Sequence, residues 1–165
     1  MIRLSRLASV GAIAVALAAC QQQQASEPQA SETAVPAAPD AKPGLALTDG
    51  RLVLPAVKDN PGAAYFSLVN SSDKPAEIAA VDVAGAGMAM LHETMQMDGH
   101  STMSEMKSPA VQPGETLVFA PGGKHVMVYK LPEGLKPGAT AEMTITFADG
   151  DKLSAPLAVE APGGG

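Results

Sequence analysis

The sequence predicts an all-β protein, an antiparallel β-sandwich, and three observations support that prediction. Its 165 residues include 16 Gly and 14 Pro but no Trp, two Tyr and three Phe, which is poor material for a large helical core. Clusters of turn-forming residues interrupt residues 45–160 at regular intervals. Between them lie short apolar segments, and residues 141–147 alternate between apolar and polar side chains. Many short strands joined by tight turns are typical of a sandwich.

The chain begins with a segment typical of an export signal. Arg3 and Arg6 form a basic start, and the apolar run that follows is too short for a comfortable membrane span. The run ends in Leu17-Ala18-Ala19-Cys20, which resembles the bacterial lipobox, in which the Cys is acylated and begins the mature protein. We therefore expect residues 1–19 to be a lipoprotein signal peptide and Cys20 to carry a lipid anchor.

Residues 20–44 are expected to be a disordered, acylated tether. They contain no aromatic residue and scarcely any large aliphatic one, so they cannot bury enough apolar area to offset their conformational entropy. A coil of this length reaches roughly 25–30 Å from its anchor. Gln21 after the Cys, by resemblance to enterobacterial lipoproteins, favours a periplasmic protein held at the outer membrane.

Residues 45–160 are expected to form the folded domain, and residues 161–165 a flexible tail. Eight or nine strands in this length favour a sandwich of immunoglobulin or cupredoxin type. The expected strands, each with the turn that follows it, are 51–57 before Asn60-Pro61-Gly62, 64–70 before Ser71-Ser72-Asp73, 76–83 before Gly85-Ala86-Gly87, 89–97 before Asp98-Gly99, 101–106 before Gln112-Pro113-Gly114, 116–120 before Pro121-Gly122-Gly123, 124–131 before Lys136-Pro137-Gly138, 140–148 before Asp149-Gly150, and 152–159.

Charge and cysteine content exclude several classes of function. The formal net charge is −6, and without the two Arg of residues 1–19 it becomes 9 − 17 = −8. Nucleic acid and anionic lipid head groups are therefore disfavoured as partners, since both require a positive surface. The single Cys excludes a disulfide framework, a cysteine zinc site and a redox pair.

Methionine and histidine gather in one part of the chain. Residues 88–106 hold six of the eight Met that follow the initiator and two of the three His. A core strand would rather use Val, Ile and Leu, whose rotamers are better defined. Thioether and imidazole are uncharged ligands, and soft sulfur donors select Cu(I) over hard cations. They also avoid the loss of exposed thiols in an oxidising compartment.

Strand geometry narrows the choice of ligands. His125 and Met127 are two residues apart on an expected strand and so lie on one face. If Asp98-Gly99 forms a two-residue turn, His92 lies opposite Glu105 with Met103 as its diagonal neighbour on the same face. A three-residue turn would instead place His92 opposite Met106. The register of this hairpin therefore decides between Met103 and Met106.

These residues resemble the PCu(A)C-type periplasmic copper chaperones, whose signature is His, ten residues, Met, twenty-one residues, then His-x-Met. His92, Met103, His125 and Met127 have these spacings. The resemblance covers most of residues 45–160 and implies a cupredoxin-like domain that binds one Cu(I) through these four residues; we expect it to be a monomer. It also implies delivery of copper to the CuA centre of cytochrome c oxidase, often alongside Sco-type thiol proteins.

Two departures from the family pattern are visible. In the family the signature Met is commonly followed by Arg-Pro-Val, and the most similar segment of this chain follows Met106. The flanking residues therefore favour Met106 as the ligand, whereas the spacing favours Met103. The lipid anchor and tether are the second departure, since many members look freely soluble.

The remaining members of the cluster have open roles. Met88, Met90, Met95 and Met97 are either core residues or an outer ring that shields the ion. His100 is an exposed turn residue or an aid to copper capture. By contrast, Met143 is expected in the core, in a row with neighbouring apolar residues of its strand.

The function predicted is that of a metallochaperone rather than an enzyme, because no nucleophile elbow, catalytic triad or paired acids stand out. Copper tolerance by sequestration is an alternative. A blue-copper electron carrier is another, but it needs a Cys thiolate beside two His, and Cys20 is expected to be acylated. A metal-free adhesion module would leave His92 and His125 without a common centre.

Overall fold

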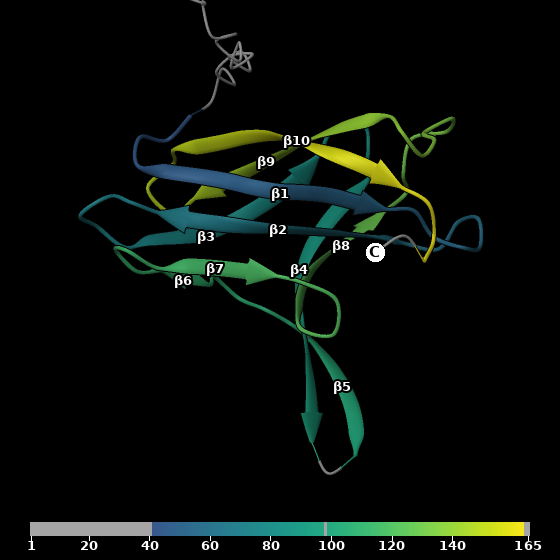
Figure 1. The fold of residues 1–165 in the computed structure, drawn as a ribbon, viewed down its shortest axis with the longest axis horizontal. Coiled ribbons are helices and arrows are strands. Elements are labelled where there is room, and N and C mark those ends of the chain that lie inside the picture. Colours follow the sequence, from purple (N-terminus) through teal and green to yellow (C-terminus); the bar gives the residue numbers. More distant parts are fainter. Residues whose placement is uncertain (1–40, 98, 164–165) are drawn as a thin grey trace, which may run out of the picture. The chain divides into compact units, whose positions relative to one another are not determined.

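The computed structural model describes residues 41–97 and 99–163, and in that part of the chain there are ten strands and no helix. The all-β prediction is confirmed (Figure 1). The expected signal peptide, Cys20, the tether as far as residue 40 and residues 164–165 of the tail lie outside the described residues. No described segment is a helix long and apolar enough to cross a membrane.

The strands are β1 (Leu45–Val53), β2 (Gly62–Asn70), β3 (Ala76–Val83), β4 (Met88–Met97), β5 (His100–Glu105), β6 (Ala110–Val111), β7 (Thr116–Phe119), β8 (Lys124–Tyr129), β9 (Thr140–Phe147) and β10 (Lys152–Glu160).

The strands pair in the order β5-β4-β8-β2-β1-β10-β9-β3-β6, and β7 pairs with β2 beside this path. The sheet curls around one hydrophobic core (Figure 1), in which Phe66 of β2 stacks on Phe119 of β7 with ring centroids 4.3 Å apart. Among the described strands the pairs are antiparallel with one exception: β1 and β10 run parallel and bring the first strand beside the last.

The first strand differs from its prediction. It covers Leu45–Val53 rather than residues 51–57. Asp49-Gly50 has the composition of a turn, but the structure accommodates it as a bulge in β1: the register with β2 shifts between Thr48 and Arg51, and Asp49 has a φ of 54°. The strand then ends before Pro55, whose nitrogen carries no hydrogen for a ladder bond.

The other eight expected strands are present, with ends shifted by at most two residues. Met143 is fully buried on β9, as expected. The two-residue strand β6, which pairs with the start of β3, was not predicted. Two residues are too few to show an alternating pattern, so the sequence carries no signal for this strand.

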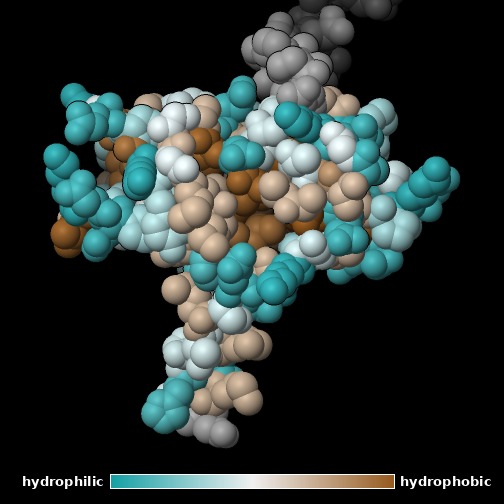
Figure 2. Space-filling view, turned by 180° about the vertical axis from the view of Figure 1, so that it is seen from behind, coloured by the Kyte–Doolittle hydropathy of each residue, from teal (hydrophilic) through white to brown (hydrophobic). Residues whose placement is uncertain are grey.

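Strands β4 and β5 form a hairpin that projects from the body of the sheet (Figures 1 and 2). The pairs run from His92 opposite Glu105 to Met97 opposite His100, which is the register expected for a two-residue turn. Gly99 in that turn has a φ of 77°, a left-handed conformation that favours glycine. The hairpin therefore carries its side chains on two faces in a defined alternation.

Candidate metal centre

The two histidines of the predicted site lie side by side on neighbouring strands. Strands β4 and β8 are antiparallel, with His92 opposite His125 and Met90 opposite Met127. The two imidazole rings have centroids 6.0 Å apart and an interplanar angle of 21°. The motifs Met-x-His on β4 and His-x-Met on β8 thus run in opposite directions, so that like residues pair. Two imidazoles and two thioethers consequently occupy one face of two strands.

Both histidines make the same kind of local hydrogen bond. His125 Nδ1 lies 2.9 Å from the carbonyl oxygen of Gly123, and His92 Nδ1 lies 3.3 Å from the carbonyl oxygen of Met90. A carbonyl can only accept a hydrogen bond, so in each ring Nδ1 is the donor, and in the neutral form of such a ring the lone pair is on Nε2. Histidines that bind metals are held in the same way, with one nitrogen donating to a carbonyl or carboxylate and the other facing the ion.

The chain before His125 explains why its ring is well held. Gly122, with a φ of 78°, turns the chain into β8, as the motif Pro121-Gly122-Gly123 predicts. The carbonyl of Gly123 also accepts a hydrogen bond from the Thr94 amide at 3.1 Å, which ties the start of β8 to β4. His125 is 6% exposed, whereas His92 is half-buried.

An ion pair joins the same two strands next to the histidines. Lys124 Nζ lies 2.8 Å from a carboxylate oxygen of Glu93, and these residues are paired across β8 and β4. Because successive residues of a strand point to opposite faces, this ion pair lies on the face away from the imidazoles. It holds the strands together without placing a carboxylate among the donors.

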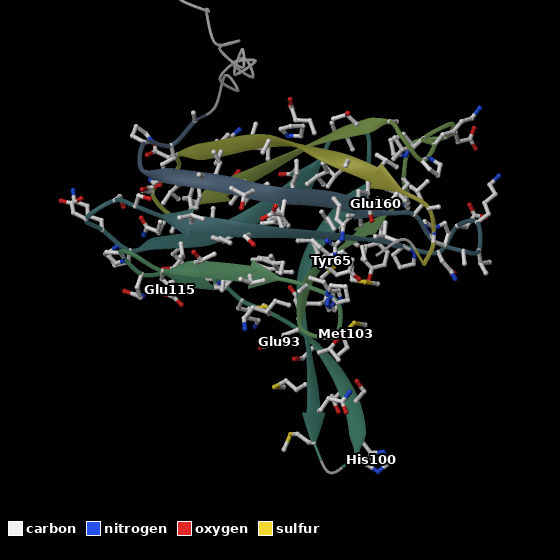
Figure 3. The ribbon with its side chains drawn as sticks, in the orientation of Figure 1. Tyr65, Glu93, His100, Met103, Glu115 and Glu160 are labelled. Atoms are coloured by element: carbon white, nitrogen blue, oxygen red, sulfur yellow. The ribbon has the colours of Figure 1, made fainter. Side chains whose placement is uncertain are left out.

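Met103 belongs to the same face as His92. It lies on β5 opposite Thr94, and Thr94 is two residues from His92 on β4, so Met103 is the diagonal neighbour of His92. Its side chain is 52% exposed and lies at the base of the projecting hairpin (Figure 3). The long, flexible thioether is therefore free to turn toward the histidine pair.

Met106 lies on the other side of the hairpin. Its amide donates a hydrogen bond to the carbonyl oxygen of Leu91 at 2.9 Å, and its side chain is half-buried against the core. Leu91 is itself a core residue. The two candidates that the register separates thus have different surroundings: Met103 is open and beside His92, whereas Met106 is packed.

Met90 has a role that the sequence leaves open. It is half-buried and lies directly opposite Met127, two residues from His92. The signal in the sequence is the mirrored pair of motifs, Met-x-His and His-x-Met. That signal becomes meaningful only once β4 and β8 are known to be neighbours.

The other members of the cluster are outside the core. Met88, Met95 and Met97 are 49%, 43% and 63% exposed. His100 is exposed at the outer end of the hairpin (Figure 3). Within residues 41–97 and 99–163, no three His, Cys, Asp or Glu side chains are grouped as a metal site. The face of β4, β5 and β8 that carries His92 and His125 also carries the thioethers of Met90, Met103 and Met127, and the exposed carboxylate of Glu105 lies opposite His92.

Comparison with solved structures shows which known proteins share this fold. DR1885 from Deinococcus radiodurans, in its Cu(I) form, is 28% identical with a TM-score of 0.53, covering 76% of this chain and 81% of that one. The copper-bound PCuAC domain from PmoF2 has a TM-score of 0.59 at 24% identity, covering 72% of this chain and 94% of that domain. Both matches are to copper-bound structures rather than to enzymes.

Sequence comparison identifies the family. A protein of Leifsonia xyli subsp. xyli described as "Putative lipoprotein Lxx21020" is 35% identical over 98 residues, which are 59% of this chain and 58% of that protein. The chain thus matches little more than half the length of this relative. A family model described as "Putative lipoprotein LpqE-like" matches residues 45–159. The resemblance to PCu(A)C-type copper chaperones is confirmed by the solved structures, and the chain belongs to the LpqE-like lipoprotein family.

Proposed function

We propose that this protein is a Cu(I) metallochaperone of the bacterial periplasm, holding one Cu(I) through His92, Met103, His125 and Met127. The observation that carries the proposal is the pair of neighbouring imidazoles on β4 and β8, each with Nδ1 bonded to a carbonyl and Nε2 available. In zinc sites a ring nitrogen lies about 2 Å from the metal. Two rings with centroids 6.0 Å apart are therefore close to the spacing that one shared ion requires.

The chemistry of the four donors favours Cu(I). None carries charge, and none supplies the oxygen ligands that calcium and magnesium prefer. Thioethers are soft ligands that suit Cu(I), and imidazole suits copper as well. The likeness to the Cu(I) form of DR1885 supports the same assignment. The ion is the cargo of this protein.

Exposure of the donors favours transfer over permanent storage. Met103 is 52% exposed and Met127 is half-buried, so an incoming ligand can reach the ion from the solvent side. Thioethers and imidazoles bind Cu(I) less tightly than a pair of thiolates would, so transfer to a cysteine acceptor is downhill. We assign as acceptor the CuA centre of cytochrome c oxidase, alone or with a Sco-type thiol protein.

Membership of a lipoprotein family supports the anchoring part of the proposal. According to this proposal, residues 1–19 of the chain are removed and Cys20 is acylated. Residues 20–44 then tether the copper-binding domain of residues 45–160 to the outer membrane. The domain acts as a monomer. A tethered domain stays in the envelope yet reaches acceptors within its radius.

Binding is tested by competition for Cu(I) between the mature chain and a chromophoric Cu(I) chelator. His125→Ala combined with Met127→Ala should lower the affinity by about a hundredfold or more, which corresponds to ~2.7 kcal/mol. Met88→Ala is the matched control, since Met88 is an exposed methionine on β4 that is not among the proposed ligands. Circular dichroism checks that each variant folds. Unchanged affinity in the folded double variant would contradict the ligand assignment.

Delivery is tested separately from binding. The Cu(I)-loaded chain is mixed with the metal-free CuA domain of the oxidase subunit at two copper ions per domain. A one-electron oxidant, ferricyanide, is then added, and the visible absorption of the mixed-valence, thiolate-bridged dinuclear centre is followed. Appearance of that band with loss of copper from the chaperone supports delivery. Retention of copper by the loaded chain would point to sequestration and copper tolerance instead.

A further inference from the structure

The outer end of the β4–β5 hairpin carries a second group of soft donors. Met97 lies opposite His100 in the last pair before the turn, and Met95 is two residues before Met97 on the same strand. Alternation along a strand therefore places Met95, Met97 and His100 on one face of the hairpin. Residues opposite one another in such a pair have Cβ atoms about 4.5–5.5 Å apart, close enough for long side chains to share an ion.

These three residues, called here the tip group, are separate from the candidate metal centre. His92 and Met103 lie on the opposite face of the hairpin, because they alternate with Met95 and His100 along the two strands. Along β4, Met97 is five residues from His92, which at ~3.4 Å per residue is about 17 Å, and Met95 is about 10 Å away. A single ion therefore cannot bind both groups.

The side chains of the tip group are not packed in the hydrophobic core. Met95 is 43% exposed, Met97 is 63% exposed, and all six residues of β5, His100 among them, are exposed. Four of the six large hydrophobic side chains that are exposed in the described residues are methionines: Met95, Met97 and Met103 of the hairpin, and Met88 at the start of β4, where the strand pairs with β8. A surface that only docked against an apolar partner would be served equally by Leu or Val, whereas thioethers add a soft donor atom.

We propose that Met95, Met97 and His100 form a second soft-metal site that binds Cu(I), or Ag(I) as its surrogate, independently of the candidate metal centre. The site has three donors on an exposed projection (Figures 2 and 3). Because exposed flexible side chains must be ordered around the ion, it binds more weakly and exchanges faster than the four-donor centre. Its position on a projecting hairpin suits first contact with a metal donor or acceptor. This inference goes beyond the proposed function and does not require it.

The test is a titration of the mature chain with Ag(I), followed by NMR of methionines labelled with carbon-13 in their methyl groups. We expect two ions to bind. The first should shift the methyl signals of Met103 and Met127, and the second should shift those of Met95 and Met97, while buried Met143 stays unchanged as the internal control. Absence of any shift at Met95 and Met97 after two equivalents would overturn the proposal.

A variant separates metal binding from apolar docking at the tip. Met95→Leu, Met97→Leu and His100→Gln together keep the size and much of the apolar character of the hairpin but remove its soft donor atoms. Native mass spectrometry should then count one silver ion per chain instead of two. A count still equal to that of the unchanged protein would defeat the assignment.

A second variant separates this inference from the proposed function. With His125→Ala and Met127→Ala in place, the methyl signals of Met95 and Met97 should still shift on addition of Ag(I). If they do, the tip group binds metal even when the four-donor centre has lost two of its ligands. If the shifts at the tip disappear with the central histidine and methionine, the two groups are not independent and the second site is refuted.

Discussion

Strands β9 and β5 use methionine in opposite ways. On β9, inward residues alternate with outward ones, and Met143 is fully buried in a row of apolar neighbours. On β5 every residue is exposed, and Met103 faces solvent beside His92. Both strands alternate along their length, but only β9 has a second layer of side chains to pack against. A methionine on β5 or the outer half of β4 therefore has to be explained by its sulfur.

The difference also concerns how each region is held. The body of the sheet is stabilised by apolar burial around pairs such as Phe66 and Phe119. The hairpin is stabilised by the backbone pairing of β4 with β5, by the turn at Gly99 and by the pairing of β4 with β8 at its base, where His92 lies opposite His125. Changes in the hairpin should consequently alter metal binding, while changes in the body should alter stability.

The largest effect is expected from matched substitutions of two methionines. Met143→Ala should lower the free energy of unfolding by about 2–5 kcal/mol, because a fully buried side chain is lost and a cavity remains. Met97→Ala, at a side chain 63% exposed, should change it by no more than about 0.5 kcal/mol. Chemical denaturation measures both. Equal losses would mean that the outer hairpin is part of the cooperative core.

The second prediction concerns Met103 and Met106. Met103→Ala should weaken Cu(I) binding at least about tenfold, or ~1.4 kcal/mol, with little change in stability. Met106→Ala should leave the affinity nearly unchanged but lower the free energy of unfolding by about 1 kcal/mol, since its side chain packs against the core. Chelator competition measures the Cu(I) affinity of the two variants, and chemical denaturation measures their free energy of unfolding. The reverse pattern would assign the ligand to Met106.

The hairpin shows what sequence reasoning predicts well. The sequence allowed a two-residue or a three-residue turn, and each alternative specified every pair along β4 and β5; the structure has the register of the two-residue turn, with His92 opposite Glu105. Local turn chemistry and strand alternation also identified eight of the strands. Asp49-Gly50 has similar chemistry, yet it forms a bulge inside β1 because the chain on both sides of it pairs with β2. Whether such a pair turns the chain or bulges depends on partners distant in sequence.

The pairing of β4 with β8 could not be predicted in the same way. The residues that meet there, such as His92 and His125, are more than thirty positions apart, and no single turn sets their register. Only the resemblance to the family signature predicted that these two histidines share a site. Met90 was left undecided for this reason, since its place opposite Met127 depends on the register of two strands that do not follow one another in the chain.

Met90 supplies the third prediction. If its sulfur supports the ion without being one of the four main ligands, Met90→Leu should weaken Cu(I) binding by about threefold, or ~0.65 kcal/mol, and much less than Met127→Leu. Leucine keeps the volume of this half-buried position, so stability should change by under about 1.5 kcal/mol. Chelator competition measures the affinities. A loss equal to that of Met127→Leu would make Met90 a full ligand and displace one of the four.

The smallest effect is expected at an ion cluster on the body, where Lys42 contacts both Asp149 and Asp151 and lies over the Phe147 ring. The hydrogen bond from Lys42 lowers the pKa of Asp149 below its ordinary value. A carboxyl whose pKa is lower in the folded state adds stability above its ordinary pKa, and that stability is lost as the pH falls through the lowered value.

Asp149→Asn should therefore slightly lower the midpoint of thermal unfolding at neutral pH. The difference from the unchanged protein should shrink as the solution is acidified below about pH 3.9, the ordinary pKa of an aspartate, and vanish once the pH has passed through the lowered value. Asp82→Asn, on the exposed side of β3 and outside the Lys42 cluster, is the control for the loss of a carboxylate as such.

The same variant also tests whether the two regions are independent. Asp149 lies in the turn between β9 and β10, away from β4, β5 and β8, so the Cu(I) affinity of Asp149→Asn at neutral pH should remain that of the unchanged protein. Chelator competition measures this affinity. A change would show that the body and the metal-binding strands are coupled, and the separation between stability in one region and binding in the other would no longer hold.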